Sequence, residues 1–337
     1  MLFPVLLLLV GFAILIKGAD FLVNGASSAA KKYGISNLAI GLTVVAFGTS
    51  MPELIVSLLS ALDGKNDASF GNIIGSNNFN LLFILGIAGL IYPLVVQRNT
   101  IKYEVPLSML AAIILFVLVN DTLLWGTSSF IEGTATYQGI LSRLDSIVLL
   151  LLFGLFIVYI YRTMRNSSDL DEGEPIKLYS TPISVGMITI GLAMLIGGGE
   201  LVVDNAIEIA RGYGLSEKLI GLTILAAGTS LPELATSCVA AYRKNTDIAI
   251  GNVVGSNIFN IFFILGITGV IHPVPYNAAM NFDIMVLVVS TLLLLIFMFT
   301  LNSRKLDRWE AFLMLVAYFA YTTYLISTDS GAAAVNP

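Results

Sequence analysis

The chain has 337 residues, of which 57% are hydrophobic and 12% charged, with a formal net charge of −5. A soluble globular domain carries about 25% charged residues, so this composition excludes an ordinary soluble protein and indicates a membrane protein. The charges form no basic stripe, which argues against a nucleic-acid partner, and a single cysteine, Cys238, excludes an intramolecular disulfide.

Hydrophobic runs long enough to cross a bilayer, roughly 20 residues each, occur along the whole chain. They predict an all-α membrane protein with ten transmembrane helices. The expected spans are about 2–24, 36–61, 69–92, 104–124, 145–163, 180–203, 216–241, 249–271, 283–301 and 307–327. The first run lacks a basic n-region and a small-residue cleavage site, so we expect a retained helix rather than a signal peptide.

Two stretches of the chain repeat each other at a constant offset of 180 residues. GLTVVAFGTSMPELIVSLLSA (Gly41–Ala61) corresponds to GLTILAAGTSLPELATSCVAA (Gly221–Ala241), and the match resumes at Ser69–Gly86 and Ala249–Gly266. Each copy contains five expected spans, an odd number, so the second copy enters the membrane from the opposite face. This predicts two inverted-topology five-helix repeats with an ion or substrate site at the midplane between them.

The repeat divides the chain into four expected segments. These are a first repeat (1–161), a cytoplasmic linker (162–179), a second repeat (180–328) and a frayed tail (329–337). The linker sequence RTMRNSSDLDEGEPIK is rich in Ser, Asp, Glu and Pro, which predicts a flexible connection. Its acidic run lacks the length and ligand spacing of an EF-hand, so we favour a solvated charge run over a regulatory calcium site. The polar segment Asn120–Arg143 is an expected external loop.

The basic residues of the loops set the expected orientation. With the N-terminus outside, twelve Lys and Arg fall in cytoplasmic loops and four on the opposite side. Because Lys and Arg are retained on the cytoplasmic side, we expect a multi-pass plasma-membrane protein with both termini extracellular. In the first span, Lys17 and Asp20 are three residues apart and are expected to form a local ion pair. Glu200, which corresponds to Asp20, is a candidate residue for an ion entrance.

The first repeated motif, GTSMPE in one copy and GTSLPE in the other, places oxygen-bearing side chains in an apolar span. Thr49 and Ser50 precede Glu53 by four and three residues, so in a helix the three share a face. Pro52 lacks an N–H, and its ring crowds the carbonyl one turn back, near Gly48, with Ala46 just below the break. Backbone oxygens released there are tolerated in lipid only where they line a cavity or coordinate a ligand. The second copy supplies Ala226, Thr229, Ser230 and Glu233.

The second repeated motif, GNxxGSNxFN, places Ser76 and Asn80 four residues apart on one face, with Asn72 one turn before them. Gly71 and Gly75 form a small-xxx-small pair that allows close helix approach. The counterparts are Gly251, Asn252, Gly255, Ser256 and Asn260. We expect the third and eighth spans to pack against the second and seventh and to enclose an oxygen-lined site. Any one of these polar residues alone could equally join helices, and for Asn72 and Asn252 the two roles are evenly balanced.

The charge of the two glutamates limits what such a site can bind. Together they bring about −2, which a divalent cation neutralises, and polar groups at membrane depth usually mark a transport pathway. Calcium accepts six to eight oxygens at about 2.3–2.6 Å, whereas magnesium demands an octahedron. Neither motif contains His or Cys, which argues against zinc and copper. The residues themselves therefore predict a site for a hard cation.

The duplicated GTS[ML]PE and GNxxGSNxFN motifs resemble those of the sodium/calcium exchanger family of the calcium/cation antiporter superfamily, in its prokaryotic form. The resemblance implies a secondary active antiporter that exchanges Na+ for Ca2+ by alternating access and is electrogenic. It implies an ion-binding core of the second, third, seventh and eighth spans, over which the first and sixth slide. It implies neither a catalytic residue nor a cofactor nor a protein partner. The implied metal ligands are Ala46, Thr49, Ser50, Glu53, Ser76, Asn80, Ala226, Thr229, Ser230, Glu233, Ser256 and Asn260.

One position of this set bears on potassium. Some relatives, including potassium-dependent ones, carry Asp where this chain has Asn260. The symmetric pair Asn80 and Asn260 is similar to that of potassium-independent exchangers, so the resemblance implies transport that does not need K+.

Other functions stay open from the residues. Calcium/proton or other cation exchange is the closest alternative, although calcium/proton exchangers typically carry GNxxE in place of GTSxPE. A passive channel would conduct without a counter-ion. An intramembrane enzyme would need a metal motif or a Ser/His or Cys/His pair, whereas this chain has one loop histidine, His272, and one helix cysteine, Cys238. A structural scaffold would not require paired intramembrane glutamates.

Overall fold

The structure is a computed structural model that describes residues 2–120, 139–163, 177–213, 226–300 and 304–335. Within these ranges eight helices are long and apolar enough to cross a membrane. A ninth span results if the helix pair Asn37–Thr49 and Met51–Leu62, bent by 46°, is counted as one. The protein is therefore an all-helical, multi-pass membrane protein.

The two halves of the chain contain similar series of helices. The first half has α1 (Leu2–Tyr33), α2 (Asn37–Ile40), η1 (Gly41–Val45), α3 (Ala46–Thr49), α4 (Met51–Leu62), α5 (Asn66–Asn78), η2 (Phe79–Ile84), α6 (Leu85–Ile91), η3 (Thr100–Glu104), α7 (Val105–Val119) and α9 (Arg143–Thr163). The second half has α10 (Thr181–Gly212), α12 (Ala226–Gly228), α13 (Leu231–Tyr242), α14 (Thr246–Phe259), η5 (Asn260–Leu265), α15 (Gly266–Ile271), η6 (Ala278–Met280), α16 (Asn281–Phe297) and α17 (Arg308–Val335).

Four short strands join loops in antiparallel pairs. β1 (Leu94–Val95) pairs with β4 (Lys305–Leu306), and β2 (Gly139–Leu141) pairs with β3 (Val274–Tyr276). Each pair links a loop of the first half to a loop of the second. The two strand pairs therefore connect loops of the first half of the chain to loops of the second half.

Nine of the ten expected spans overlap the candidate membrane spans of the described residues. The seventh, 216–241, falls partly on α12 and α13 and partly on residues outside the described ranges. Most of the expected linker (162–179) and most of the expected external loop also lie outside them. Two local expectations differ from the structure: α17 continues to Val335, through most of the expected tail, and Asp20 pairs with Arg243 instead of Lys17.

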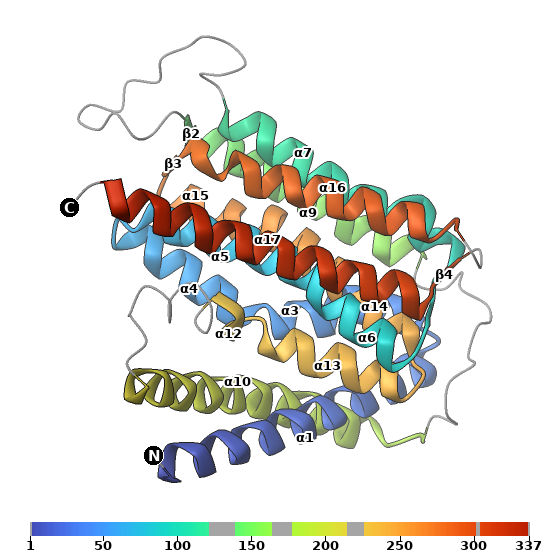
Figure 1. The fold of residues 1–337 in the computed structure, drawn as a ribbon. Helices are drawn as coiled ribbons and strands as arrows, with labels where there is room; N and C mark the ends of the chain where they lie inside the picture. Colours follow the sequence, from blue (N-terminus) through green and yellow to red (C-terminus); the bar gives the residue numbers. More distant parts are fainter. Residues whose placement is uncertain (1, 121–138, 164–176, 214–225, 301–303, 336–337) are drawn as a thin grey trace.

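The helices are arranged around two buried spans. The most apolar windows of Asn66–Ile91 and Thr246–Ile271 are 78% buried, against 22–39% for the windows of the other six unbroken candidate spans among the described residues. α5 packs against α4, and α14 packs against α13, η1 and α3. In Figure 1, α7, α9 and α16 lie on one side of this core and α1 and α10 on the other. The third and eighth spans are thus the centre of the molecule.

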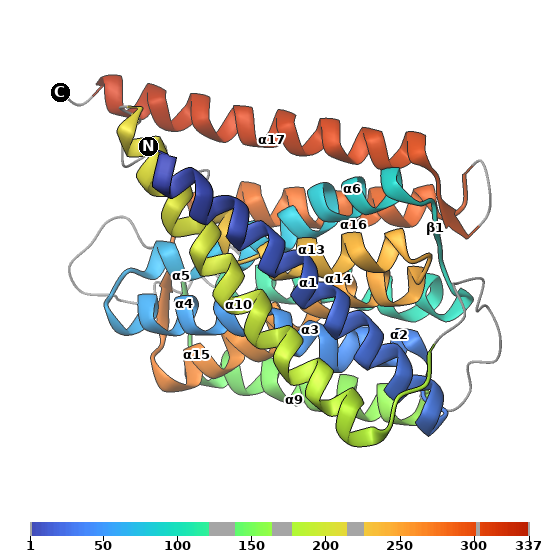
Figure 2. The same ribbon diagram turned by 90° about the horizontal axis from the view of Figure 1, so that it is seen from below.

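α1 and α10 form a separate pair that crosses one face of the core, side by side in Figure 2. Each has 32 residues, about 48 Å at 1.5 Å per residue, so each exceeds the roughly 30 Å hydrocarbon core and must tilt or project beyond it. Gly11, Gly18 and Gly25 recur every seven residues on α1 and face α10. A Cβ atom at Gly18 would lie 2.8 Å from the Met194 Cβ and 2.9 Å from the Gly191 carbonyl oxygen. Small residues therefore permit the close approach of the two helices.

We predict that Gly18→Val destabilises the protein by about 1–3 kcal/mol, because the added atoms would force α1 away from α10. The measurement is thermal unfolding of the purified protein in detergent. Gly197→Val is the matched control, since a Cβ atom there meets nothing within 4 Å. Equal melting temperatures for the two variants would contradict the proposed role of the glycines in the α1–α10 contact.

Candidate ion-binding site

Both glutamates of the repeated motif lie just after a break in a helix. α3 ends at Thr49 and α4 begins at Met51, and Ser50 between them leaves helical geometry with φ −84° and ψ 8°. Ser230 has φ −89° and ψ 8° at the same place before α13. Proline is tolerated in the first turn of the new helix, where its missing N–H has no partner to lose. The break therefore puts Glu53 and Glu233 in first turns, where the helix dipole favours negative charge.

The two carboxylates are held by hydroxyl groups from the opposite half of the chain. The Ser50 Oγ donates to Glu233 Oε1 at 2.9 Å, and the Ser230 Oγ donates to Glu53 Oε1 at 3.0 Å. All four side chains are fully buried. The two GTSxPE motifs, 180 residues apart in sequence, thus form a single site.

A second pair of contacts also crosses between the halves. The Thr49 hydroxyl donates to Asn252 Oδ1 at 3.0 Å, and the Thr229 hydroxyl donates to Asn72 Oδ1 at 3.1 Å. Each asparagine amide then donates within its own half, as Asn252 does to the Glu233 carbonyl oxygen at 3.2 Å and to the Ser237 Oγ at 2.9 Å. Asn72 and Asn252 therefore use both ends of their amides to tie the glutamate-bearing helices to the third and eighth spans.

Four asparagines at the centre of the core form a reciprocal network. Asn77 and Asn257 each donate from Nδ2 to the other's carbonyl oxygen, at 3.2 Å in both directions. Asn80 Nδ2 donates to Asn257 Oδ1 at 3.0 Å, and Asn260 Nδ2 donates to Asn77 Oδ1 at 2.9 Å. The amide nitrogens of Asn80 and Asn260 are thus hydrogen-bonded, whereas their Oδ1 atoms have no hydrogen-bond partner. Both residues lie in the π-helical segments η2 and η5, a local geometry common at functional sites.

Buried oxygens without a hydrogen-bond partner belong to several of these residues. Within the part of the chain that the structure describes they include Glu53 Oε2, Glu233 Oε2, Ser76 Oγ, Asn80 Oδ1 and Asn260 Oδ1. A buried polar group that is left unpaired costs about 1–3 kcal/mol, so such oxygens in one site point to a ligand that binds oxygen. A hard cation such as Ca2+ or Na+ satisfies oxygens of carboxylate, amide and hydroxyl type together.

The other expected ligands are less free than these five oxygens. The Ser256 Oγ donates to Glu233 Oε1 at 3.4 Å. The Ala46 carbonyl oxygen accepts the N–H of Ser50 at 3.0 Å and is also approached by the Thr49 hydroxyl at 3.4 Å. Ala226 is the first residue of α12. The described residues contain no group of three or more His, Cys, Asp and Glu, so any cation here would have a mixed ligand set with two carboxylates.

Sequence reasoning did not single out Asn77 and Asn257, or the serines Ser57 and Ser237 that receive the Asn72 and Asn252 amides. A signal was present, because each of these residues is identical in the two copies at the offset of 180. By contrast, the neighbouring Asn78 is matched by Ile258. Asn78 donates away from the site, to the Asp283 carbonyl oxygen at 3.0 Å.

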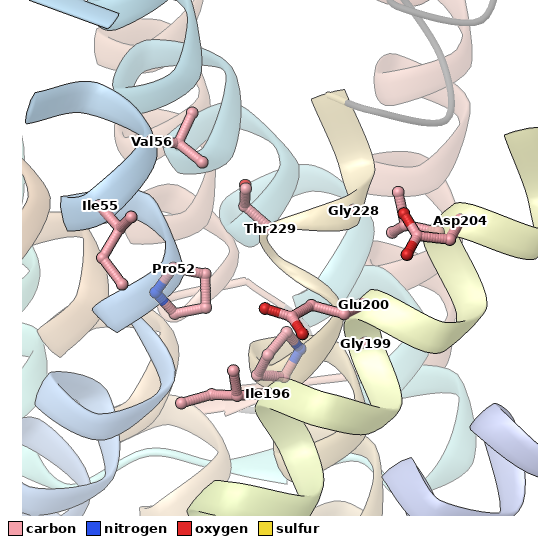
Figure 3. A pocket seen from close by; sticks show the side chains of 11 residues that line it. Pro52, Ile55, Val56, Ile196, Gly199, Glu200, Asp204, Gly228 and Thr229 are labelled. Atoms are coloured by element: carbon pink, nitrogen blue, oxygen red, sulfur yellow. The ribbon is translucent and has the colours of Figure 1, made fainter. Parts of the chain in front are cut away.

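A cavity of about 720 Å³, including its open mouth, lies beside the site between α4, α10 and the α12–α13 break (Figure 3). Its walls are largely apolar and include Pro52 and Pro232, the two prolines of the motifs. Glu200, Asp204 and Thr229 contribute the polar groups. Because the Thr229 hydroxyl also donates to Asn72, the cavity reaches the edge of the buried cluster.

Comparisons with known proteins agree with this architecture. A sequence profile described as "Sodium/calcium exchanger protein" matches residues 3–162 and 183–327. The chain is 37% identical to the putative antiporter CaxA of Alkalimonas amylolytica over 97% of this chain and 100% of that protein. It is 32% identical to the sodium/calcium exchanger MaX1 of Methanosarcina acetivorans over 95% and 97% of the two chains. A solved structure of the sodium-calcium exchanger NCX_Mj, soaked with Na+ and Sr2+, superimposes with a TM-score of 0.78 at 32% identity, covering 95% of this chain and 97% of that one.

We predict that Asn257→Ala weakens cation binding about tenfold, because the Asn80 carboxamide loses the acceptor that orients it. Equilibrium binding of radioactive Ca2+ to the purified, monodisperse protein measures this effect. Asn78→Ile, which copies the residue at the matching position of the second repeat, is the control and should bind normally. Unchanged binding in Asn257→Ala would show that the asparagine network does not support the site.

Proposed function

The chain belongs to the sodium/calcium exchanger family, and we propose that it is a secondary active antiporter that exchanges Na+ for Ca2+ across a membrane by alternating access. The observation that carries the proposal is the buried cluster of unpaired oxygens around Glu53 and Glu233. The proposed ligands are the twelve residues of the two motifs named from the sequence.

The proposed coupling follows from sharing the same carboxylates. Ca2+ would bind between Glu53 and Glu233, whose combined charge it neutralises, and its flexible coordination suits the irregular oxygen set. Na+ ions would use the same carboxylates together with the surrounding hydroxyl and carbonyl oxygens. Because Ca2+ and Na+ compete for these groups, the site holds one or the other, and the flux of one drives the other. Unequal charge transfer in the two directions makes the exchange electrogenic.

The proposed route to the site is the cavity between α4 and α10. It extends from an open mouth to Thr229, and Glu200 and Asp204 on its wall would attract cations. Among the described residues, the α1–α10 pair contacts the core mainly through α13, α2 and α3, an arrangement that would allow it to move as a unit over the buried spans.

We further propose the remaining features of the architecture. They are ten spans in two inverted repeats (1–161 and 180–328), a cytoplasmic linker (162–179), a tail (329–337) and an ion site at the membrane midplane. The excess of basic residues on one set of loops supports a plasma-membrane protein with both termini extracellular. The reciprocal hydrogen bonds between positions 180 residues apart support the two-repeat organisation.

We predict that sodium-loaded liposomes containing the protein take up radioactive Ca2+ only when an outward Na+ gradient is present. Glu53→Gln and Glu233→Gln should each reduce uptake by about a hundredfold, because a buried ligand charge is lost. Glu208→Gln removes an exposed carboxylate of α10 and is the control. Uptake that ignores Na+ but follows a pH gradient would instead assign the protein to proton-coupled exchange.

We also predict that K+ is not required. Among the described residues, two carboxylates belong to the proposed site, and Asn80 and Asn260 are neutral amides. The proposed site therefore has no third negative charge that would favour an additional monovalent cation. Replacing K+ by choline on both sides of the liposome membrane should leave sodium-driven Ca2+ uptake unchanged. Uptake that stops without K+ would refute the assignment.

A further inference from the structure

The two repeats differ in how their long first helix meets the core. α1 packs extensively along α13. Its counterpart α10 is separated from α4, the counterpart of α13, by the cavity described above. The same contact is therefore closed in one half of the molecule and open in the other.

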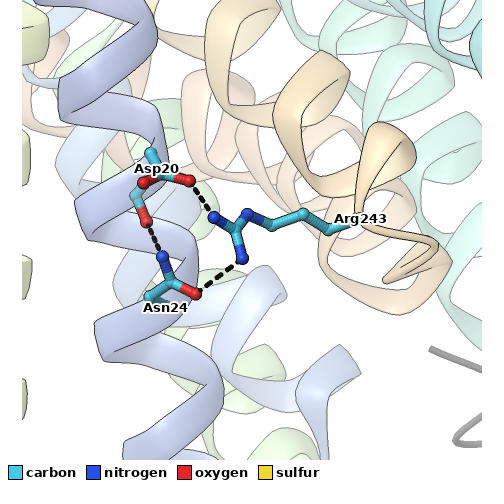
Figure 4. Close-up of polar contacts among 3 residues, drawn as sticks. All are labelled: Asp20, Asn24 and Arg243. Atoms are coloured by element: carbon cyan, nitrogen blue, oxygen red, sulfur yellow. Dashed lines mark hydrogen bonds and ion pairs between the residues drawn. The ribbon is translucent and has the colours of Figure 1, made fainter. Parts of the chain in front are cut away.

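An ion-pair cluster fastens the closed contact (Figure 4). Arg243, at the end of α13, pairs with the Asp20 carboxylate of α1 and donates through Nη1 to Asn24 Oδ1 at 3.0 Å. Asn24 Nδ2 in turn donates to the Asp20 carbonyl oxygen at 2.8 Å. Two residues further on, Asn245 Nδ2 donates to the Ser27 Oγ of α1 at 3.0 Å. The turn that joins α13 to α14 is thus attached to α1 by charged and neutral hydrogen bonds.

The cluster is partly shielded from solvent, because the Arg243 and Asp20 side chains are 31% and 26% exposed. An ion pair in such a position loses less of its attraction to screening than one on an open surface. Every time the α1–α13 contact opens, this pair must break and its groups must be solvated.

The sequence does not repeat this residue set on the open side. At the offset of 180, Asp20 corresponds to Glu200, Asn24 to Asp204, and Arg243 to Asp63. Three acidic residues thus replace an Asp–Asn–Arg set. Asp63 pairs locally with Lys65 at 3.3 Å, and both side chains are more than 60% exposed. Closing α10 onto α4 would bring acidic groups together, which repel each other.

We propose that Asp20, Asn24 and Arg243 form a one-sided lock that holds the α1–α13 side closed, so that the conformation open between α4 and α10 is the more stable of the two used in transport. The inference rests on the proposed alternating-access function for its biological meaning, but not for its test. With the orientation proposed above, the lock closes the cytoplasmic side. It makes the two conformations unequal in free energy, because a contact present in one state alone biases the equilibrium toward that state.

The first experiment measures the lock directly, as the distance between spin labels on Lys32→Cys in α1 and Tyr242→Cys in α13, in a Cys238→Ser background. Both labelled positions are exposed. The full chain is reconstituted in lipid nanodiscs without Na+ or Ca2+. We expect a dominant short distance in the parent protein. Arg243→Gln should raise the ratio of long to short distances roughly threefold to tenfold, the effect of losing one partly buried ion pair.

The reversed pair Asp20→Arg with Arg243→Asp should restore the short distance, which separates the effect of the ion pair from damage to the fold. An unchanged distance distribution in Arg243→Gln would overturn the lock. Failure of the reversed pair to restore it, in protein that remains monodisperse, would also overturn it.

The second experiment adds a lock to the open side. Asp63→Arg would place a guanidinium opposite Glu200 and Asp204. It should shorten the distance between labels on Leu62→Cys and Tyr213→Cys, the near-symmetric pair at the ends of α4 and α10, whereas Asp63→Asn should do so less. No shortening in Asp63→Arg would contradict the inferred correspondence between the two sides.

The outcomes also separate the lock from the proposed function. Distances are measured without transported ions, so a shift in Arg243→Gln supports the lock even if liposomes show no Na+/Ca2+ exchange. Exchange without any shift in Arg243→Gln would support the proposed function and overturn the lock.

Discussion

Two carboxylates buried inside an apolar helical bundle impose the main constraint on this structure. Glu53 and Glu233 are fully buried, and charge in such surroundings is tolerated only with partners. Each receives a hydroxyl from the opposite half of the chain, through Ser230 and Ser50. The two halves must therefore pack against each other at the glutamates. The breaks before α4 and α13 place Glu53 and Glu233 at this contact between the halves. The buried spans on either side then supply the amides that hold it.

Four asparagines of the third and eighth spans hydrogen-bond to one another and leave two of their side-chain oxygens without a partner. Asn77 and Asn257 bond to each other's backbone and fix the amide nitrogens of Asn80 and Asn260. The oxygens of those two side chains have no hydrogen-bond partner, and their segments η2 and η5 pack against α13 and α4, the helices that carry the glutamates. A network that satisfies its donors and leaves acceptors unpaired is arranged for a positive ligand. The same bonds cross between the halves, so the residues that orient the proposed ligands also hold the core together.

The near-symmetry of the site contrasts with the asymmetry around it. Inside the core, the hydrogen bond from Ser50 to Glu233 has its counterpart in the bond from Ser230 to Glu53, at the offset of 180 residues. At the periphery, the Asp20–Arg243 contact has none, and a cavity occupies the matching place. A symmetric glutamate site can bind a cation that arrives from either side of the membrane. The asymmetric contacts of α1 and α10 with α13 and α4 would determine which side is open. This division is consistent with the proposed alternating access, in which the α1–α10 pair would move over a core that changes little.

The sequence by itself determined the membrane-spanning character, most spans, the repeat and the residues of the cluster, because bilayer thickness and a constant offset are properties of the linear chain. It also limited the chemistry to a hard cation, since both motifs carry oxygen groups without His or Cys. Only the tertiary structure decided which groups are partners. Ser50 donates a hydrogen bond to Glu233, 183 residues away. Asp20 pairs with Arg243, 223 residues away, although Lys17 is close to Asp20 in the sequence. Such partners are set by the packing of α1 on α13 and of the two halves on each other, and local spacing carries no information about that packing.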